Sequence, residues 1–413
     1  MNHDCIPQAA YLHIPFCRRR CYYCDFPIAV VGDRVRGEGA ARIDRYVEKL
    51  CQEIAIAPTW PHPLETIFFG GGTPSLLDAS QIEQLLAALD RQFGIAANAE
   101  ISIEMDPGTF TLEQLQAYLA AGVNRVSLGV QAFQAELLST CGRAHDLDDV
   151  WVAIATLQKS PLANFSLDLI SGLPHQSLNQ WQTTLQTAIE VAPQHLSTYD
   201  LIVEPTTVFG RSYQAGTAPL PADETAAQMY RLAQQMLVEA GYEHYEISNY
   251  GQPGWQCRHN RMYWENRPYY GFGMGAASYL MGKRFTRPRK LQAYYQWLHD
   301  QQTQPHSPQP ITHTPSATET DVLLDTLMLG LRLAEGVSFS AIASRFGQPS
   351  ATQILTCLQP YVQQGWVQLS SSDNQPLQCP GERESTIEQL KLSDPEGFLF
   401  SNTILSTLFS VLG

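Results

Sequence analysis

The chain has 413 residues, of which 44% are hydrophobic and 16% are charged, and its net charge is -14. This length predicts roughly two or three domains, and the composition is typical of a folded protein and argues against long disordered regions. The strongly negative charge excludes the whole chain as a general binder of nucleic acid or anionic membranes.

The N-terminal sequence and the apolar runs predict a cytoplasmic protein. The opening sequence MNHDCIPQAAYLHIPF has neither a basic start followed by an apolar stretch nor a small-residue cleavage site, so we expect no export signal. The uncharged stretch 268–282 is shorter than the ~20 apolar residues that a bilayer span requires. Nine cysteines in a chain without an export signal favour reduced thiols and metal ligation over disulfides.

From residue 9 to about 205, short β-branched or aromatic runs alternate with amphipathic helical stretches. This alternation is the pattern of repeated βα units around a parallel sheet. We expect strands at 10–14, 66–69, 100–104, 125–130, 164–170 and 195–201. Six such units predict an α/β fold, a partial (β/α)6 barrel, in which chemistry gathers where the strands end.

The sequence also predicts how the chain is divided into domains and a linker. We expect the barrel to occupy 1–215 and an aromatic-rich extension to occupy 216–300. The run 301–320, rich in Pro, Thr and Gln, predicts a linker. The last part, 321–413, predicts a smaller, mostly helical domain of winged-helix-like order.

Three cysteines follow the first expected strand. Cys17, Cys21 and Cys24 lie within eight residues, so one short loop can wrap one metal centre. A 4Fe-4S cluster held by three thiolates keeps one iron without a protein ligand, which a small molecule can occupy. Zinc is the alternative, but structural zinc sites are usually closed by four ligands, and no second cysteine pair lies at zinc-finger spacing.

The spacing Cys-x3-Cys-x2-Cys after a first strand resembles the signature of the radical S-adenosylmethionine (SAM) enzymes. This resemblance implies that Cys17, Cys21 and Cys24 hold a 4Fe-4S cluster and that SAM chelates its open iron. It also implies that electron transfer from the cluster can cleave SAM to a 5′-deoxyadenosyl radical. Phe26, two residues after the last cysteine, would help to shield the cluster from solvent.

A glycine-rich loop, FGGGTPS, follows the second expected strand. Glycines let a ligand approach the backbone closely. The loop lacks the Lys-Ser/Thr ending of a nucleoside triphosphate loop. In the radical SAM family this position resembles the loop that binds the amino group of SAM, which implicates Gly71, Gly72 and Thr73. A tight turn without a ligand is the alternative.

Four polar residues lie in or just beyond the later strands. They are Glu104 in SIEMDP, Gln131 in GVQ, Arg143 in GRAH and Asp168 in LDLISGLP. Taken singly, each is more often a cap or a surface residue. Taken in this order, they resemble a heme-biosynthetic branch of the family, which contains oxygen-independent coproporphyrinogen oxidases and heme chaperones. The resemblance extends from Tyr11 to the C-terminal GFLFSN, and it implies that these four residues, with Tyr11, bind one or two SAM molecules.

Two features distinguish the chain from the oxidases of that branch. The oxidases have a further cysteine two positions after the third, where this chain has Phe26. Only 16 residues precede the cluster motif, a shorter lead than the oxidases generally have. Both departures argue against decarboxylation of coproporphyrinogen III, which is kept as the alternative function.

A second motif, CRHNRMYW, begins at Cys257. It resembles the His-Asn-x-x-Tyr-Trp motif of the heme chaperones, in which the histidine, here His259, is implicated in holding heme. Imidazole is a common axial ligand of heme iron, and aromatic residues offer a flat surface to a macrocycle. Basic residues from Arg258 to Lys290 form the densest positive run of the chain, and arginine binds carboxylates such as heme propionates in a bidentate manner. The alternative is that His259 is a hydrogen-bonded core histidine and that the arginines are solvated.

These resemblances therefore imply a heme chaperone that binds a 4Fe-4S cluster, SAM and heme, and that transfers heme to an acceptor hemoprotein, either soluble or a membrane-bound respiratory protein. We expect no nucleic-acid partner. The oligomeric state is left open, and a homo-oligomer is compatible with the sequence.

Overall fold

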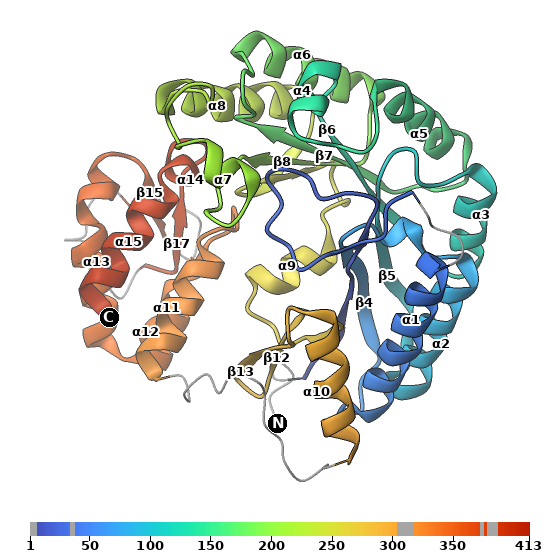
Figure 1. Cartoon of the computed structure of the whole chain (residues 1–413). Helices are drawn as coiled ribbons and strands as arrows, with labels where there is room; N and C mark the ends of the chain where they lie inside the picture. Colours follow the sequence, from blue (N-terminus) through green and yellow to red (C-terminus); the bar gives the residue numbers. More distant parts are fainter. Residues whose placement is uncertain (1–5, 34–37, 304–317, 372–375, 378–386) are drawn as a thin grey trace. The chain divides into compact units, whose positions relative to one another are not determined.

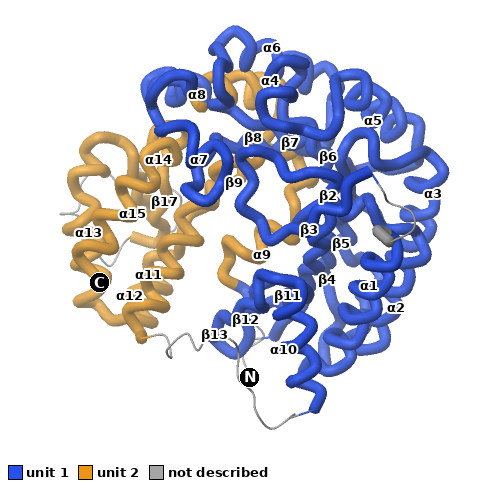
Figure 2. The backbone as a smooth tube through the Cα atoms, in the orientation of Figure 1, with its two compact units in different colours: residues 1–229, 267–314 blue, residues 230–266, 315–413 orange. Residues whose placement is uncertain are grey.

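A computed structural model describes residues 6–33, 38–303, 318–371, 376–377 and 387–413. The chain divides into two compact units, residues 1–229 with 267–314 and residues 230–266 with 315–413 (Figure 2). The expected extension 216–300 is thus divided between both units. Most of the expected linker 301–320 lies outside the described residues, because 304–317 are not among them.

Parallel strands form the sheet of the first unit. Their spatial order is β11, β1, β4, β5, β6, β7 and β8, and each neighbouring pair is parallel. The strands are β1 (Ala9–Ile14), β4 (Leu64–Gly71), β5 (Ile95–Met105), β6 (Arg125–Gln131), β7 (Phe165–Ser171), β8 (His195–Asp200) and β11 (Tyr270–Phe272). All six expected strands are present. The strand β11, which pairs with β1, was not predicted, because a three-residue strand gives too short a sequence pattern.

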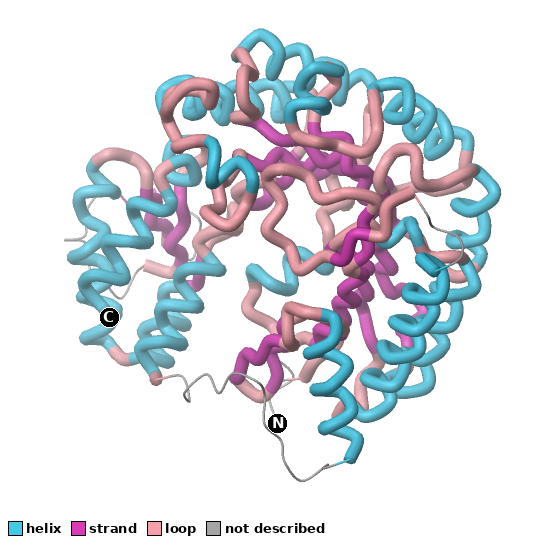
Figure 3. The backbone as a smooth tube through the Cα atoms, viewed as in Figure 1, coloured by secondary structure: helices cyan, strands magenta, loops and turns pink. Residues whose placement is uncertain are grey.

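Helices cover the outer side of these strands (Figures 1 and 3). They are α1 (Glu38–Ile56), α2 (Ala79–Phe93), α3 (Leu112–Ala120), α4 (Ala135–Thr140), α5 (Leu147–Lys159), α6 (Leu178–Val191) and α10 (Leu291–Thr303), while α8 (Asp223–Glu239) spans the division between the units. The short helix α7 (Val208–Ser212) lies against the cysteine loop instead, where the Phe209 N–H donates to the backbone oxygen of Tyr22 at 3.0 Å. Helix α2 shows why they form: Ile82, Leu85 and Leu89 recur on one buried face, and Asp78 with Gln81 makes a capping box at its start. The predicted α/β partial barrel is confirmed.

Strand β7 shows how the sheet separates two environments. Leu167 and Leu169 are buried on one side, while Ser166 and Asp168, one residue out of phase, point to the other side. Asp168 lines a cavity, and so do residues that follow the ends of several strands. The sheet thus places polar side chains in the barrel interior, at the carboxyl ends of the strands.

A buried ion pair attaches the later segment of the first unit to its beginning. Arg287 Nε lies 2.7 Å from Glu53 Oε1 on α1, and Tyr294 on α10 donates to Glu53 Oε2 at 2.8 Å. Both charged side chains are at most 5% exposed. Tyr46, also on α1, donates to the backbone oxygen of His13 at 2.7 Å. These bonds hold α1, α10 and β1 together behind the cysteine loop.

The second unit is mostly helical, and its C-terminal part has the helical character that the sequence predicts. Its helices are α9 (Arg258–Trp264), α11 (Glu319–Gly330), α12 (Phe339–Phe346), α13 (Gln348–Gln363), α14 (Glu396–Leu399) and α15 (Ser401–Leu412). Its strands are β9 (Glu243–Glu246), β10 (Asn249–Gly251), β14 (Val337–Ser338), β15 (Val367–Ser370), β16 (Pro376–Leu377) and β17 (Gln389–Leu392). The last four form an antiparallel sheet in the order β14, β17, β15, β16. Leu327, Ile354 and Leu408 are fully buried in its core.

Across the described ranges, none of the helices combines the length and the apolar character needed to cross a membrane.

Candidate metal and cofactor site

The three cysteines line a cavity of 590 Å³ in the first unit. Cys17 ends the two-residue strand β2 (Phe16–Cys17), which pairs with β3 (Ala29–Val30), and Cys21 and Cys24 follow in the loop. Backbone hydrogen bonds hold the loop at Tyr22, whose N–H donates to the backbone oxygen of Cys141 at 3.0 Å and whose carbonyl accepts from the Phe209 N–H at 3.0 Å.

Burial affects the protonation of the cysteine thiols and therefore their ability to bind a metal. Burial raises the pKa of Cys17 to about 12 and also raises the pKa of Cys24. Thiolates, and not thiols, are metal ligands, so these sulfurs become ligands only when bound cations offset the desolvation of their charge. Within the described part of the chain, no three His, Cys, Asp or Glu side chains lie close enough to share a single metal ion.

The glycine loop at the end of β4 lies against the cysteine strand. Gly71 has φ +113°, and a Cβ atom there would collide with the ring of His13. A Cβ at Gly72 would come within 2.7 Å of the backbone oxygen of Phe16. Both glycines also line the cavity. Close packing of the chain on itself is therefore sufficient reason for these glycines, and a role for the loop in ligand binding stays a prediction.

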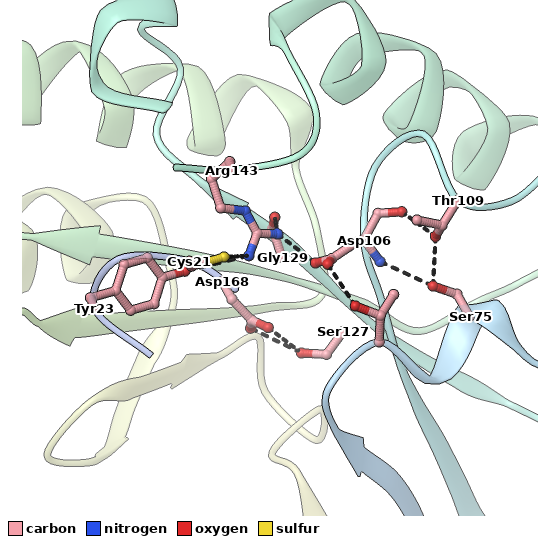
Figure 4. Close-up of polar contacts among 10 residues, drawn as sticks. Cys21, Tyr23, Ser75, Asp106, Thr109, Ser127, Gly129, Arg143 and Asp168 are labelled. Carbon is pink, nitrogen blue, oxygen red and sulfur yellow. Dashed lines mark hydrogen bonds and ion pairs between the residues drawn. The ribbon is translucent and has the colours of Figure 1, made fainter. Parts of the chain in front are cut away.

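Arg143 connects three parts of the cavity wall (Figure 4). Its Nη2 donates to Asp106 Oδ1 at 2.5 Å and to the backbone oxygen of Gly129 at 3.0 Å, and its Nη1 lies 3.5 Å from Cys21 Sγ. Thr73 Oγ1 donates to the other oxygen of Asp106 at 3.0 Å. The glycine loop, the end of β5 and the cysteine loop thus share one hydrogen-bond network. Asp106 was not among the predicted site residues, although its place directly after a strand and before a proline was visible in the sequence.

Two carboxylates lie deeper in the cavity, on β5 and β7. Glu104 Oε2 accepts a hydrogen bond of 2.8 Å from the Gly71 N–H, and Ser127 Oγ lies 2.9 and 3.0 Å from the two oxygens of Asp168. Burial raises the pKa of Glu104 to about 8: the Gly71 hydrogen bond opposes this effect, and Asp168 and Asp106 add to it. Burial also raises the pKa of Asp168, against hydrogen bonds from Ser127 and Ser197. A cationic group placed between them would favour their ionised forms.

Gln131 ends β6 in an unusual conformation. Its φ of 70° is uncommon for a residue other than glycine, and the pairing of β6 with β7 shifts register between Gly129 and Gln131. The side chain lines the cavity. Register shifts of this kind re-aim side chains and are frequent beside functional sites.

The cavity brings most of the predicted residues together. Its walls include Cys17, Cys21, Cys24, Phe26, Gly71, Gly72, Thr73, Glu104, Gln131, Arg143 and Asp168. Tyr11 is not among the lining residues: its hydroxyl lies 3.0 Å from His13 Nδ1, and its ring stacks on Phe68. Phe26 is 60% exposed, so it shields the site less than the sequence suggested. The roles of all these residues stay predictions.

His259 belongs to the second unit, on α9. It is fully buried, and its Nε2 and Tyr263 OH share a hydrogen bond of 3.0 Å, with the two rings edge to face at 5.1 Å. This is the environment of a hydrogen-bonded core histidine. Heme iron that binds to Nε2 would have to displace the tyrosine hydroxyl.

Several residues of the basic run that begins at residue 258 pair with carboxylates. Arg261 pairs with Glu335 at 2.8 Å, Arg267 lies 3.7 Å from Glu65, and Arg287 pairs with the buried Glu53. Binding of heme propionates by this basic run stays a prediction. Arg289 lines the cluster cavity, where its Nη2 donates to the backbone oxygen of Asp25 at 2.7 Å and lies 3.4 Å from the Asp25 carboxylate.

Comparison with known families agrees with this architecture. Residues 11–188 match the radical SAM superfamily, and residues 317–373 match the HemN C-terminal domain. Among solved structures, coproporphyrinogen III oxidase (HemN) from Escherichia coli, described as a radical SAM enzyme, superposes with a TM-score of 0.77 over 98% of this chain and 91% of that chain. The sequence identity is 22%, so this likeness concerns the fold.

Several proteins have a higher sequence identity to this chain than that solved structure. The heme chaperone HemW of Synechocystis sp. is 48% identical over 408 residues, which cover 98% of this chain and 97% of that protein. The heme chaperone HemW of Bacillus subtilis is 34% identical over 88% of this chain and 94% of its own length. That of Escherichia coli is 39% identical over 65% of this chain and 69% of its own length. With the first two relatives, the similarity includes both units.

Proposed function

The chain belongs to the HemW family of radical SAM proteins, and we propose that it acts as a heme chaperone in the cytoplasm. It would hold heme and transfer it to an acceptor hemoprotein, which is either soluble or a membrane-bound respiratory protein. The proposal rests on similarity to proteins named heme chaperone, which extends over 98% and 88% of this chain. It also rests on the three thiols that line one cavity with Glu104, Arg143 and Asp168.

Within that cavity, Cys17, Cys21 and Cys24 would hold a 4Fe-4S cluster. When bound, the cluster supplies a redox centre and one open iron for the amino and carboxylate groups of SAM. Arg143 restrains the loop at Cys21 and fixes Asp106, so the loop and the cavity wall keep one relative position. SAM, whose net charge is positive, would favour the ionised forms of Glu104 and Asp168 when it binds between them.

Heme would bind through His259 after the imidazole exchanges its hydrogen bond with Tyr263 for iron. The departure from the oxidase pattern at position 26 supports a chaperone, because the exposed Phe26 supplies no thiol where those enzymes have a cysteine. Decarboxylation of coproporphyrinogen III is the competing function, favoured by the HemN-like fold.

An anaerobic heme titration of the cluster-loaded protein, followed in the Soret region, tests the proposal. Wild type should bind heme stoichiometrically, His259→Ala should lose the Soret shift, and His299→Ala, which removes an exposed histidine on α10, should behave as wild type. Failure of the wild type to bind heme would contradict the chaperone function, and a coproporphyrinogen decarboxylation assay would then be decisive.

A further inference from the structure

Arg143 supplies a cationic hydrogen-bond donor to one sulfur of the cysteine loop. Its guanidinium has two N–H groups on each terminal nitrogen. Those of Nη2 donate to Asp106 Oδ1 at 2.5 Å and to the backbone oxygen of Gly129 at 3.0 Å. Nη1 lies 3.5 Å from Cys21 Sγ and 3.4 Å from Tyr23 OH, which accounts for its two N–H groups. Because arginine stays protonated in proteins, Cys21 keeps this charged donor at every working pH.

Several contacts hold the guanidinium in this position. The Arg143 side chain is 7% exposed. Asp106, which binds Nη2, accepts a further hydrogen bond from Thr73 Oγ1 at 3.0 Å. The backbone oxygen of Cys141, two residues before Arg143, accepts from the Tyr22 N–H at 3.0 Å. The loop that carries the arginine and the loop that carries Cys21 are therefore joined by backbone as well as by side chain.

The ion pair with Asp106 is oriented with its positive end toward the sulfur. Figure 4 shows the guanidinium of Arg143 between the sulfur of Cys21 and the carboxylate of Asp106. Other charged residues also line the cavity, among them Asp25, Glu104, Asp168 and Arg289. They are the same in wild type and in variants at positions 106 and 143, so a comparison of these variants isolates the ion pair.

Hydrogen bonds to cysteine sulfurs and the charge around them are two factors that set the reduction potential of an iron-sulfur cluster. Reduction adds one electron, and therefore one negative charge, to a cluster and its thiolates. A fixed cationic N–H donor at a sulfur stabilises the reduced form more than the oxidised form. Burial of the guanidinium limits the screening of this effect by solvent and salt.

We propose that Arg143 raises the reduction potential of the cluster through its N–H···S contact with Cys21, and that the charge of Asp106 limits the increase. This inference rests on the proposed binding of a 4Fe-4S cluster by the three cysteines. Arg143 acts through Cys21 and is thus a positioning residue of the cluster site, not a ligand. A higher potential widens the range of one-electron reductants that can reduce the cluster.

A redox titration of the cluster-loaded protein without SAM tests the proposal. Dithionite, an inorganic one-electron reductant, sets the potential in the presence of mediator dyes, and electron paramagnetic resonance measures the reduced cluster. Arg143→Met should lower the midpoint potential by at least about 59 mV, a tenfold change for a one-electron couple. Asp106→Asn should shift it upward, because this change removes a negative charge and leaves the arginine. Arg143→Lys, which keeps the charge without the planar donor, should lie between wild type and Arg143→Met.

Two comparisons keep the test decisive. Arg91→Met, on the exposed side of α2, is the matched control and should have the wild-type potential. If Arg143→Met does not fold because Asp106 loses its partner, the double variant R143M/D106N is compared with D106N, and it should have the lower potential.

An unchanged or higher potential on loss of the arginine, in either background, would overturn the proposal while the cluster assignment stands. A wild type that assembles no cluster would contradict the proposed function and this inference with it.

Discussion

Arg143 and Asp106 form a short ion pair in the cavity wall, with 2.5 Å between Nη2 and Oδ1. The arginine side chain is 7% exposed and also reaches the backbone of Gly129 and the sulfur of Cys21. One planar guanidinium makes these contacts at once, which a lysine ammonium on a flexible stem cannot do.

Arg143→Lys should therefore keep the positive charge and lose the simultaneous contacts with Asp106, Gly129 and Cys21. We expect a loss of about 1.5–3 kcal/mol in the free energy of unfolding, the usual value for hydrogen bonds to charged groups, and SAM affinity reduced at least about tenfold. Chemical denaturation and calorimetry measure the two effects. Arg91→Lys, on the exposed side of α2, is the control. Unaltered SAM binding in Arg143→Lys would exclude a geometric role for the guanidinium.

Cys21→Ala should prevent assembly of the cluster. A cubane with only two protein thiolates lacks a ligand on a second iron, so iron, sulfide and the brown absorbance should fall to a small fraction of the wild-type values. The fold should persist, because Cys21 lies in a loop outside the main sheet. Cys51→Ala, on α1 and not among the cavity residues, should assemble a full cluster. A full cluster in Cys21→Ala would disprove the ligand assignment.

Glu104 should make stability depend on pH. Its pKa rises from an ordinary 4.5 to about 8 in the folded protein, chiefly through burial. Between these values the folded state holds a proton that the unfolded chain releases, so this contribution to stability is complete below the unfolded value and is lost as the pH rises toward 8. Glu104→Gln should keep the hydrogen bond from Gly71 and remove the titration.

In ligand-free protein, we expect Glu104→Gln to unfold about 2–8 °C above wild type near pH 8 and to differ less near pH 5. Thermal unfolding followed by circular dichroism at several pH values measures this difference. Glu113→Gln, at an exposed position of α3, supplies the reference. Parallel pH profiles for wild type and Glu104→Gln would show that Glu104 does not titrate in this range.

Tyr263→Phe should strengthen heme binding if His259 is the ligand. The hydrogen bond between Tyr263 OH and His259 Nε2 competes with iron for the same nitrogen. Its loss removes a contribution of about 1 kcal/mol, which corresponds to a roughly fivefold gain in affinity. The Soret titration measures it. Weaker binding in Tyr263→Phe would instead indicate that the tyrosine contacts heme or orients the imidazole for it.

Arg287→Met should destabilise the first unit strongly. It leaves Glu53 buried without its cation, and the loss of one partner of a buried pair typically costs about 3–5 kcal/mol. Arg267→Met is the contrast, because Arg267 and Glu65 are both 39% exposed and 3.7 Å apart, so the loss should stay within about 1 kcal/mol. Equal losses in chemical denaturation would show that burial of the Arg287 pair is energetically unimportant.

The sequence by itself determined the features that depend on neighbouring residues. The six strands up to residue 201 follow from local alternation of apolar runs, and the cysteine spacing within one short loop indicates a cluster without any knowledge of distant contacts. The positions of Glu104 and Gln131 at the carboxyl ends of β5 and β6 also follow from the sequence, whereas Asp168 lies in the middle of β7.

Tertiary structure decided which distant groups meet. Arg143 is 122 residues from Cys21, and Arg287 is 234 residues from Glu53. No local pattern separates Arg287, buried in an ion pair, from Arg289, which faces the cavity two residues later. Side-chain pairing of this kind depends on strand register and on the path of intervening loops, whereas hydrophobic periodicity reports only which side of an element is buried.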